Sequence, residues 1–148
     1  MKQTITLILI FIGFLSFAQP TQNGKTRDKI KTQKVAFITE QLELTSDEAQ
    51  KFWPIYNQFE KESREIKSKY FRPLRKQLRE DVKISDSESN KLLEQIVEGE
   101  NKMHLAKQTF ISNLKTAISA NKIIKLKAVE EEFNRKLLGK LRNHRNRN

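Results

Sequence analysis

Apolar residues recur at helical spacing over most of the chain that follows residue 26, and this pattern predicts four helices. The first is expected from Arg27 to about Leu42, and the others begin after Thr45, Ser85 and Ser119. Only four glycines and three prolines occur in 148 residues, which leaves few turns for a multi-stranded sheet. The predicted fold class is all-α, with four long helices forming an extended helical hairpin or bundle.

Two of these helix starts carry a capping box. Thr45 is followed three residues later by Glu48, and Ser85 is followed by Glu88. In this motif the hydroxyl accepts a hydrogen bond from the amide of the third helical residue, whose carboxylate accepts one from the capping amide. Leu44 stands where a hydrophobic staple would begin. We therefore expect both helices to start at these residues.

The second helix is expected to bury one apolar stripe, which Ser63 interrupts. The stripe consists of Ala49, Phe52, Tyr56, Phe59, Ile66, Tyr70, Leu74 and Leu78. Pro54 and Pro73 each lack an amide donor, so a kink or a short break is expected near each. Pro54 lies close enough to the start for the helix to re-form through it.

The third helix has a heptad-like seam typical of coiled coils, which suits packing along another long helix. The seam consists of Leu92, Ile96, Gly99, Met103, Ala106, Phe110 and Leu114. Gly99 either permits a close approach or loosens the helix by about 1 kcal/mol relative to alanine. The fourth helix starts after the N-cap Ser119, and its apolar positions are Ile123, Leu126, Val129, Phe133, Leu137 and Leu141.

The first residues have the features of a signal peptide. Lys2 precedes a nearly unbroken apolar run, 5–17, and Ser16 and Ala18 place small residues at positions −3 and −1 of a cleavage site. The run is short for a membrane span, which needs roughly 20 residues. We predict export with cleavage after Ala18, and an uncleaved anchor is the alternative.

The remaining boundaries follow from composition. Residues 19–26 are polar and contain helix breakers, so they are predicted as a flexible leader. Residues 27–142 are predicted to form one helical domain. Residues 143–148 are too polar to pack and are predicted as a basic disordered tail.

The chain is strongly basic, with a formal net charge of +11, and it has no cysteine. Such a charge usually suggests nucleic acid, but export argues against that partner. Outside the cytoplasm the expected anionic partners are acidic proteins or, through a weak contact, an anionic membrane surface. The alternative is that the charge only keeps the protein soluble.

The sequence offers little chemistry for catalysis. The histidines, His104 and His144, have no partner at ligand spacing, and no phosphate-binding glycine loop is present. The carboxylate pairs lie at a helix start or in a charged run rather than in a predicted cleft. We expect neither an enzyme nor a cofactor. A metal-responsive sensor that uses His104 and the adjacent Met103 is the weaker alternative.

The aromatic cluster at the start of the second helix is the most informative group of side chains. It consists of Phe52, Trp53, Tyr56 and Phe59. One interpretation is that all four belong to the core. The other is that part of the cluster is a candidate surface for a client or a dimer partner, because exposed aromatic residues rimmed by charge mark binding surfaces.

Two short motifs carry a resemblance to a known family. Leu44–Glu48 and Ile118–Lys122 stand before long amphipathic helices, and their pattern resembles the repeated Leu-Thr-x-x-Gln of the Spy/CpxP-like family. The run Phe52–Phe59 is similar to a Bacteroidetes branch often labelled as sensors of extracytoplasmic-function sigma factors. Glu48 and Lys122 replace the glutamines of the family, and Ile118 and Ser119 replace leucine and threonine. Lysine accepts no hydrogen bond, so the second motif is expected to keep only its cap.

The resemblance implies a thin, curved helical homodimer in the periplasm. Members of the family act as ATP-independent chaperones of unfolded envelope proteins or as regulators of envelope-stress signalling. We therefore expect a non-catalytic binding protein. The alternative is an accessory sensor that binds a membrane anti-sigma factor or a sensor kinase.

Overall fold

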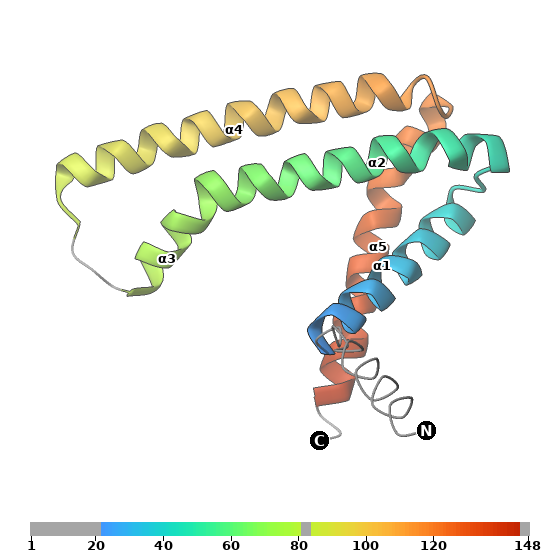
Figure 1. The fold of residues 1–148 in the computed structure, drawn as a ribbon, viewed down its shortest axis with the longest axis horizontal. Helices are drawn as coiled ribbons and strands as arrows, with labels where there is room; N and C mark the ends of the chain where they lie inside the picture. The colour runs from blue at the N-terminus through green and yellow to red at the C-terminus, as the bar shows by residue number, and fades with distance from the viewer. Residues whose placement is uncertain (1–21, 81–83, 146–148) are drawn as a thin grey trace, which may run out of the picture. The chain divides into compact units, whose positions relative to one another are not determined.

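The computed structural model describes residues 22–80 and 84–145, and every regular element in these ranges is helical (Figure 1). The helices are α1 (Gln22–Gln41), α2 (Ser46–Ile66), α3 (Arg72–Glu80), α4 (Asp86–Leu114) and α5 (Ala120–Arg145). A π-helical segment, η1 (Lys67–Phe71), joins α2 to α3 without a break. The described residues thus form four continuous helical stretches, and the predicted all-α class with four long helices is confirmed.

The chain divides into two compact units, Met1–Ala36 and Phe37–Asn148. In the first unit the described part is helical, and Thr32 Oγ1 donates to the Asp28 carbonyl oxygen at 3.0 Å. The helix begins at Gln22, so the prediction of a flexible leader is wrong for residues 22–26. Once a helix has formed, each added residue gains one backbone hydrogen bond. This gain offsets the cost of Gly24, so the helix extends through these polar residues. The predicted signal peptide and residues 19–21 lie outside the described ranges.

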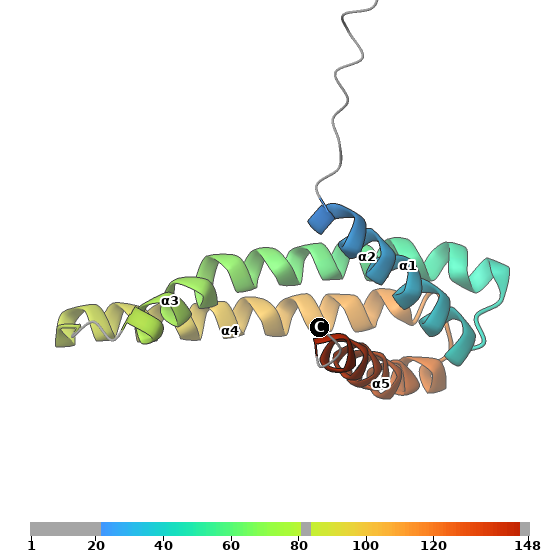
Figure 2. The same cartoon turned by 90° about the horizontal axis from the view of Figure 1, so that it is seen from below.

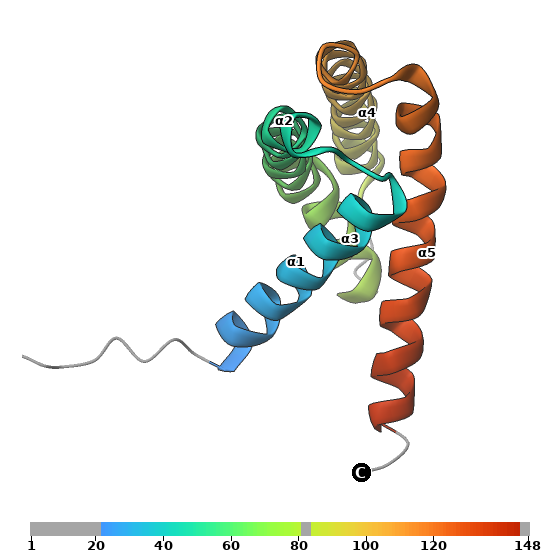
Figure 3. The same ribbon diagram turned by 90° about the vertical axis from the view of Figure 1, so that its right-hand side faces the viewer.

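In the second unit, α2 and α4 run antiparallel as a helical hairpin, and Figure 3 shows them side by side when viewed along their length. The helix α2 passes through Pro54 without a break. Pro54 therefore behaves as the sequence allowed, because only one amide near the start of the helix is lost. The helix α5 crosses the hairpin rather than running along it: it lies across α2 in Figure 1 and is seen nearly end-on in Figure 2.

The π-helical segment ends two residues before Pro73 and accounts for the break expected there. The Arg72 amide donates to the Lys67 carbonyl oxygen, five residues back, so the wider turn relieves the backbone next to a proline that donates no bond. Within this turn Tyr70 faces Gly99 of α4. A Cβ on Gly99 would lie 2.6 Å from Tyr70 Cβ, so the close-approach interpretation of Gly99 is confirmed.

Two clusters of buried side chains fill the second unit. The larger, the junction cluster, contains Ile38, Leu42, Phe52, Tyr56, Leu114, Ala117, Ile118, Leu126 and Val129. The smaller, the hairpin cluster, contains Ile66, Tyr70 and Ala106, with Phe59, Phe71 and Met103 packed against it. Ser63 does not interrupt the buried stripe, since it is itself buried and its Oγ donates to Met103 Sδ at 3.6 Å.

Two predicted core residues are exposed. Leu78 is 72% exposed because the π-helical turn contains an extra residue, which rotates the following residues by roughly 100° away from the stripe of α2. Leu141 is 52% exposed because it lies beyond Phe133, the last buried residue of α5. The helix α5 continues to Arg145, so the prediction of a disordered tail is wrong for residues 143–145. Residues 146–148 lie outside the described ranges.

Candidate functional site at the motif junction and the α2–α4 groove

Both predicted capping boxes are present. The Glu48 amide donates to Thr45 Oγ1 at 3.2 Å, and the Thr45 amide donates to Glu48 Oε2 at 2.9 Å. The same pair of bonds joins Ser85 and Glu88, at 3.3 Å and 3.0 Å. Each box therefore satisfies amide groups that a helix start leaves without an internal partner.

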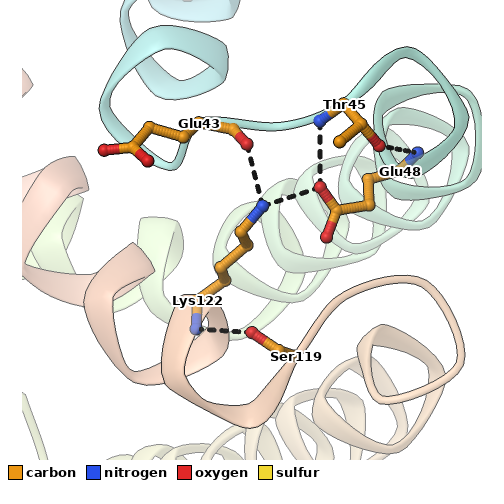
Figure 4. Close-up of polar contacts among 5 residues, drawn as sticks. All are labelled: Glu43, Thr45, Glu48, Ser119 and Lys122. Carbon is orange, nitrogen blue, oxygen red and sulfur yellow. Dashed lines mark hydrogen bonds and ion pairs between the residues drawn. The ribbon is translucent and has the colours of Figure 1, made fainter.

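The second motif keeps its cap and also contacts the first motif. The Lys122 amide donates to Ser119 Oγ at 3.4 Å, as predicted for an N-cap, and Ile118 is buried in the junction cluster. Figure 4 shows Lys122 Nζ reaching Glu48 Oε2 at 2.7 Å and the Glu43 carbonyl oxygen at 2.8 Å. The expectation that Lys122 leaves the second motif with only its cap is therefore wrong.

The carbonyl group that Lys122 contacts belongs to a residue in an uncommon backbone conformation. Glu43 has a φ of 50°, in the left-handed region where glycine is usually found. Its amide donates to the Glu40 carbonyl and the Leu44 amide donates to the Thr39 carbonyl, each at 3.0 Å, which is the Schellman pattern of a helix end. Leu44 packs against the junction cluster, so the turn directs the chain into α2.

The Glu48–Lys122 ion pair is only partly accessible to water, with the two side chains 23% and 24% exposed. The hydrogen bond from Lys122 and then that from the Thr45 amide lower the pKa of Glu48 below its ordinary value of 4.5. The carboxylate thus stays ionised in mildly acidic solution, where it joins the start of α2 to the start of α5. Glu48 and Lys122 occupy corresponding positions of the two motifs and have opposite charges, and this pattern in the sequence could have predicted their contact.

The aromatic cluster is mostly buried within one chain. Phe52 and Tyr56 belong to the junction cluster, and Trp53 is partly buried, with edge contacts to both rings at centroid distances of 4.9 Å and 5.4 Å. Phe59 is half-buried and stacks on Phe110 of α4, with centroids 4.2 Å apart and an interplanar angle of 9°. The core interpretation therefore holds for Phe52 and Tyr56, whereas Phe59 lies at a surface.

Tyr56 also joins the hairpin to α5 through a polar contact. Its hydroxyl donates to Glu130 Oε1, and burial followed by this hydrogen bond raises the pKa of the phenol far above its ordinary value. A buried hydroxyl needs a partner, and Glu130 supplies it from α5. This contact orients α5 against the aromatic cluster.

Phe59 and Phe110 line an open groove of about 270 Å³ between α2 and α4. The complete lining consists of Pro54, Ile55, Gln58, Phe59, Glu62, Ala106, Thr109, Phe110 and Asn113. The lining combines rings and aliphatic groups with amide, hydroxyl and carboxylate groups, which can hydrogen-bond to a polar main chain. The sequence pattern placed Phe59 and Phe110 on packing stripes but gave no sign that a groove would remain between them.

The candidate metal residues do not converge. Met103 packs in the hairpin cluster, whereas His104 is exposed on α4. Within residues 22–80 and 84–145, no group of three or more histidine, cysteine or carboxylate side chains is arranged to hold a metal ion. In the same ranges, no helix combines the length and the apolarity that crossing a bilayer requires.

Comparison of the chain with protein-family models, with curated proteins and with solved structures finds no match. The resemblance of the two motifs to the Spy/CpxP-like family therefore stays a prediction from the residues themselves.

Proposed function

We propose that this chain is an exported, non-catalytic binding protein of the cell envelope that holds unfolded protein segments without ATP, in the manner of Spy/CpxP-like chaperones. The observation that carries the proposal is the open groove between α2 and α4, where Phe59 and Phe110 present apolar surface beside hydrogen-bonding side chains. An unfolded segment offers both apolar side chains and main-chain polar groups. The groove can accept both without requiring one sequence.

The charge of the chain supports the same function. The chain has a formal net charge of +11, and the predicted cleavage would remove only the one charge of Lys2, so the protein attracts acidic segments over a distance. Charge of this kind raises association rates more than final affinity. Fast capture with modest affinity suits a protein that must release its client without an energy source. The junction between the two motifs supports the proposal indirectly, because it fixes the end of the hairpin that carries the groove.

An aggregation assay tests the proposal. The purified protein is expected to slow aggregation of an unrelated, chemically unfolded client in the absence of ATP. Thr109→Glu places a carboxylate over the groove, and Gln108→Glu places the same charge on a neighbouring exposed position outside the lining. We expect Thr109→Glu to lower protection several-fold and Gln108→Glu to leave it unchanged. Equal activity of the two variants, or no protection by the native chain at several-fold excess, contradicts the proposal.

The regulatory alternative predicts a different set of partners. Capture of binding proteins from envelope extracts is expected to recover many clients at low and variable amounts. Recovery of one membrane protein in stoichiometric amount, such as an anti-sigma factor or a sensor kinase, would instead favour regulation. Calorimetric titration with nickel, copper and zinc tests the metal-sensor alternative, for which heat of binding from any of the three is required.

A further inference from the structure

The short helix α3 has a concentrated positive charge that neither the core nor the groove uses. Arg72, Arg75, Lys76 and Arg79 are all exposed, and Glu80 is the one acidic residue of the helix. With 3.6 residues per turn, these four basic positions occupy roughly a 100° arc of the helix. The Arg75 Nε group donates to the Phe71 carbonyl oxygen at 3.4 Å, and this contact holds the guanidinium near the start of α3.

Apolar side chains are exposed at the same end of the hairpin. Leu78 flanks the basic arc, roughly 60° from Arg75 around the axis of α3, and is 72% exposed. The hydrogen bond from the Tyr70 hydroxyl to Glu98 Oε1, at 2.8 Å, aligns η1 with the first half of α4. On that half Leu93 and Val97 are 58% and 57% exposed. Figure 1 shows α3 and the start of α4 together at the end of the hairpin away from α5.

We propose that this end of the hairpin, formed by α3 and by Leu93 and Val97 in the first half of α4, binds the surface of an anionic lipid bilayer. Basic side chains bind anionic headgroups, while an exposed leucine beside them inserts at the boundary of the acyl chains. Long arginine side chains reach the headgroup level while their aliphatic stems remain near apolar surface. An acidic protein segment would match the charge, but it offers no apolar phase for Leu78, Leu93 and Val97. The proposal is independent of client binding, since the groove contains no residue of α3.

The direct test is flotation of the full chain with lipid vesicles at physiological salt. The protein is expressed with its own leader and purified in the processed form that the host leaves. One set of vesicles contains equal parts of phosphatidylglycerol and phosphatidylcholine, and the other contains phosphatidylcholine alone. We expect binding to the anionic vesicles only, and we expect added salt to weaken it.

Matched variants assign the binding to α3. Arg72→Gln together with Arg79→Gln removes two charges from the arc, and Lys127→Gln together with Lys140→Gln removes two exposed charges from α5. At about 1 kcal/mol for each basic residue near the membrane, the α3 pair is expected to bind about thirty-fold more weakly. The α5 pair is expected to change binding less than two-fold or so by the same electrostatics, because its charges lie away from the surface that binds. Leu78→Gln is expected to weaken binding several-fold.

Three outcomes overturn the proposal. The first is no preference for anionic vesicles, and the second is an equal effect of the α3 and α5 pairs. The third is tighter binding to immobilised polyglutamate than to the vesicles, which would assign the patch to an acidic protein. Circular dichroism of each variant shows that its helices are retained, so that a loss of binding reports on the surface. Failure in this assay leaves the aggregation result unaffected.

Discussion

The two ends of the α2–α4 hairpin are held together in different ways. At the motif junction, Ile38 and Phe52 are fully buried in a cluster that receives side chains from α1, α2, α4 and α5. At the other end two helical stretches meet, and the contact depends on Gly99, on the turn that contains Tyr70 and on one hydrogen bond to Glu98. The junction is a core, whereas the far end is a close pairing of two helices.

This difference indicates where stability and adaptability lie. Burial of apolar area is the main source of stability, so the junction cluster is expected to unfold last. The far end buries few side chains and exposes Leu78, Leu93 and Val97. Both proposed binding surfaces, the groove and the end at α3, lie on the hairpin, and of the groove residues Ile55 and Phe110 also pack against the junction cluster. The fixed junction allows the hairpin to bind without loss of the fold.

The largest expected effect comes from emptying the junction. Phe52→Ala removes a fully buried ring that contacts Trp53 and Tyr56, and it is expected to lower the free energy of unfolding by about 3–5 kcal/mol. Leu78→Ala is the matched variant on the sequence-predicted stripe. Since Leu78 is exposed, its loss is expected to cost within about 0.5 kcal/mol. Urea unfolding followed by circular dichroism measures both, and similar losses would mean that the two ends are equally packed.

A second pair of variants examines the close pairing at the far end. Gly99→Ala places a Cβ 2.6 Å from Tyr70 Cβ, so the helices must separate, and the expected loss is about 1–3 kcal/mol. Gly139→Ala meets nothing within 4 Å in α5 and is expected to stabilise the protein by up to about 1 kcal/mol. The same unfolding experiment gives both values. If Gly99→Ala and Gly139→Ala changed the free energy of unfolding in the same direction, the close approach at Gly99 would be contradicted.

The ion pair between the motifs gives the junction a dependence on pH. Because the folded state lowers the pKa of Glu48, this group adds stability above its ordinary value of 4.5, and the addition is lost as pH falls through the lowered pKa. The melting temperature of Glu48→Gln is expected to fall less steeply in acid than that of the native chain. Glu88→Gln is the comparison: hydrogen bonds from Ser85 and, as a lesser cause, Lys91 lower the pKa of Glu88, so this variant gives the effect of a capping box without an ion pair between the motifs.

The Leu-Thr-x-x-Gln pattern that the two motifs resemble suggests a further variant at the same pair. Combining Glu48→Gln with Lys122→Gln places glutamine at both motif positions, and two amides can hydrogen-bond to each other. We expect the double variant to lose less stability than the sum of the single variants, which is the sign of a direct contact. Simple additivity would mean that the charges at 48 and 122 act separately.

Local sequence patterns predicted the fold well where the interacting residues are close together in the sequence. The capping boxes at Thr45 and Ser85 and the seam through Gly99 each depend on residues a few positions apart, and all are present. The exposure of Leu78 could not be predicted in this way. Periodicity assumes a constant number of residues per turn, and the π-helical turn before Pro73 changes that number.

The candidate site was predicted only in part, because its main contacts join distant segments. The two motifs were found from the sequence, but Lys122 was expected to leave the second motif with only its cap, whereas it supplies the contact between them. The groove depends on which sides of α2 and α4 stay uncovered, and tertiary packing rather than the periodicity of either helix sets this. Both the ion pair and the groove join residues that are far apart in the sequence, so the pattern of residues within one helical turn cannot predict either of them.

The smallest expected effect concerns the turn that leads into the junction. Glu43 has a φ of 50°, which costs an L-residue roughly 1–2 kcal/mol and glycine almost nothing. Glu43→Gly is therefore expected to stabilise the protein, by about 0.5–1 kcal/mol after the greater chain entropy of unfolded glycine is included. Glu40→Gly, at a helical position three residues earlier, is expected to destabilise it by about 1 kcal/mol. Urea unfolding measures the change in the free energy of unfolding for each variant. An increase for Glu43→Gly and a decrease for Glu40→Gly would show that the left-handed turn, which Lys122 contacts, is strained within an otherwise well-packed junction. Destabilisation by both variants would show instead that the Glu43 side chain contributes more than its backbone conformation costs.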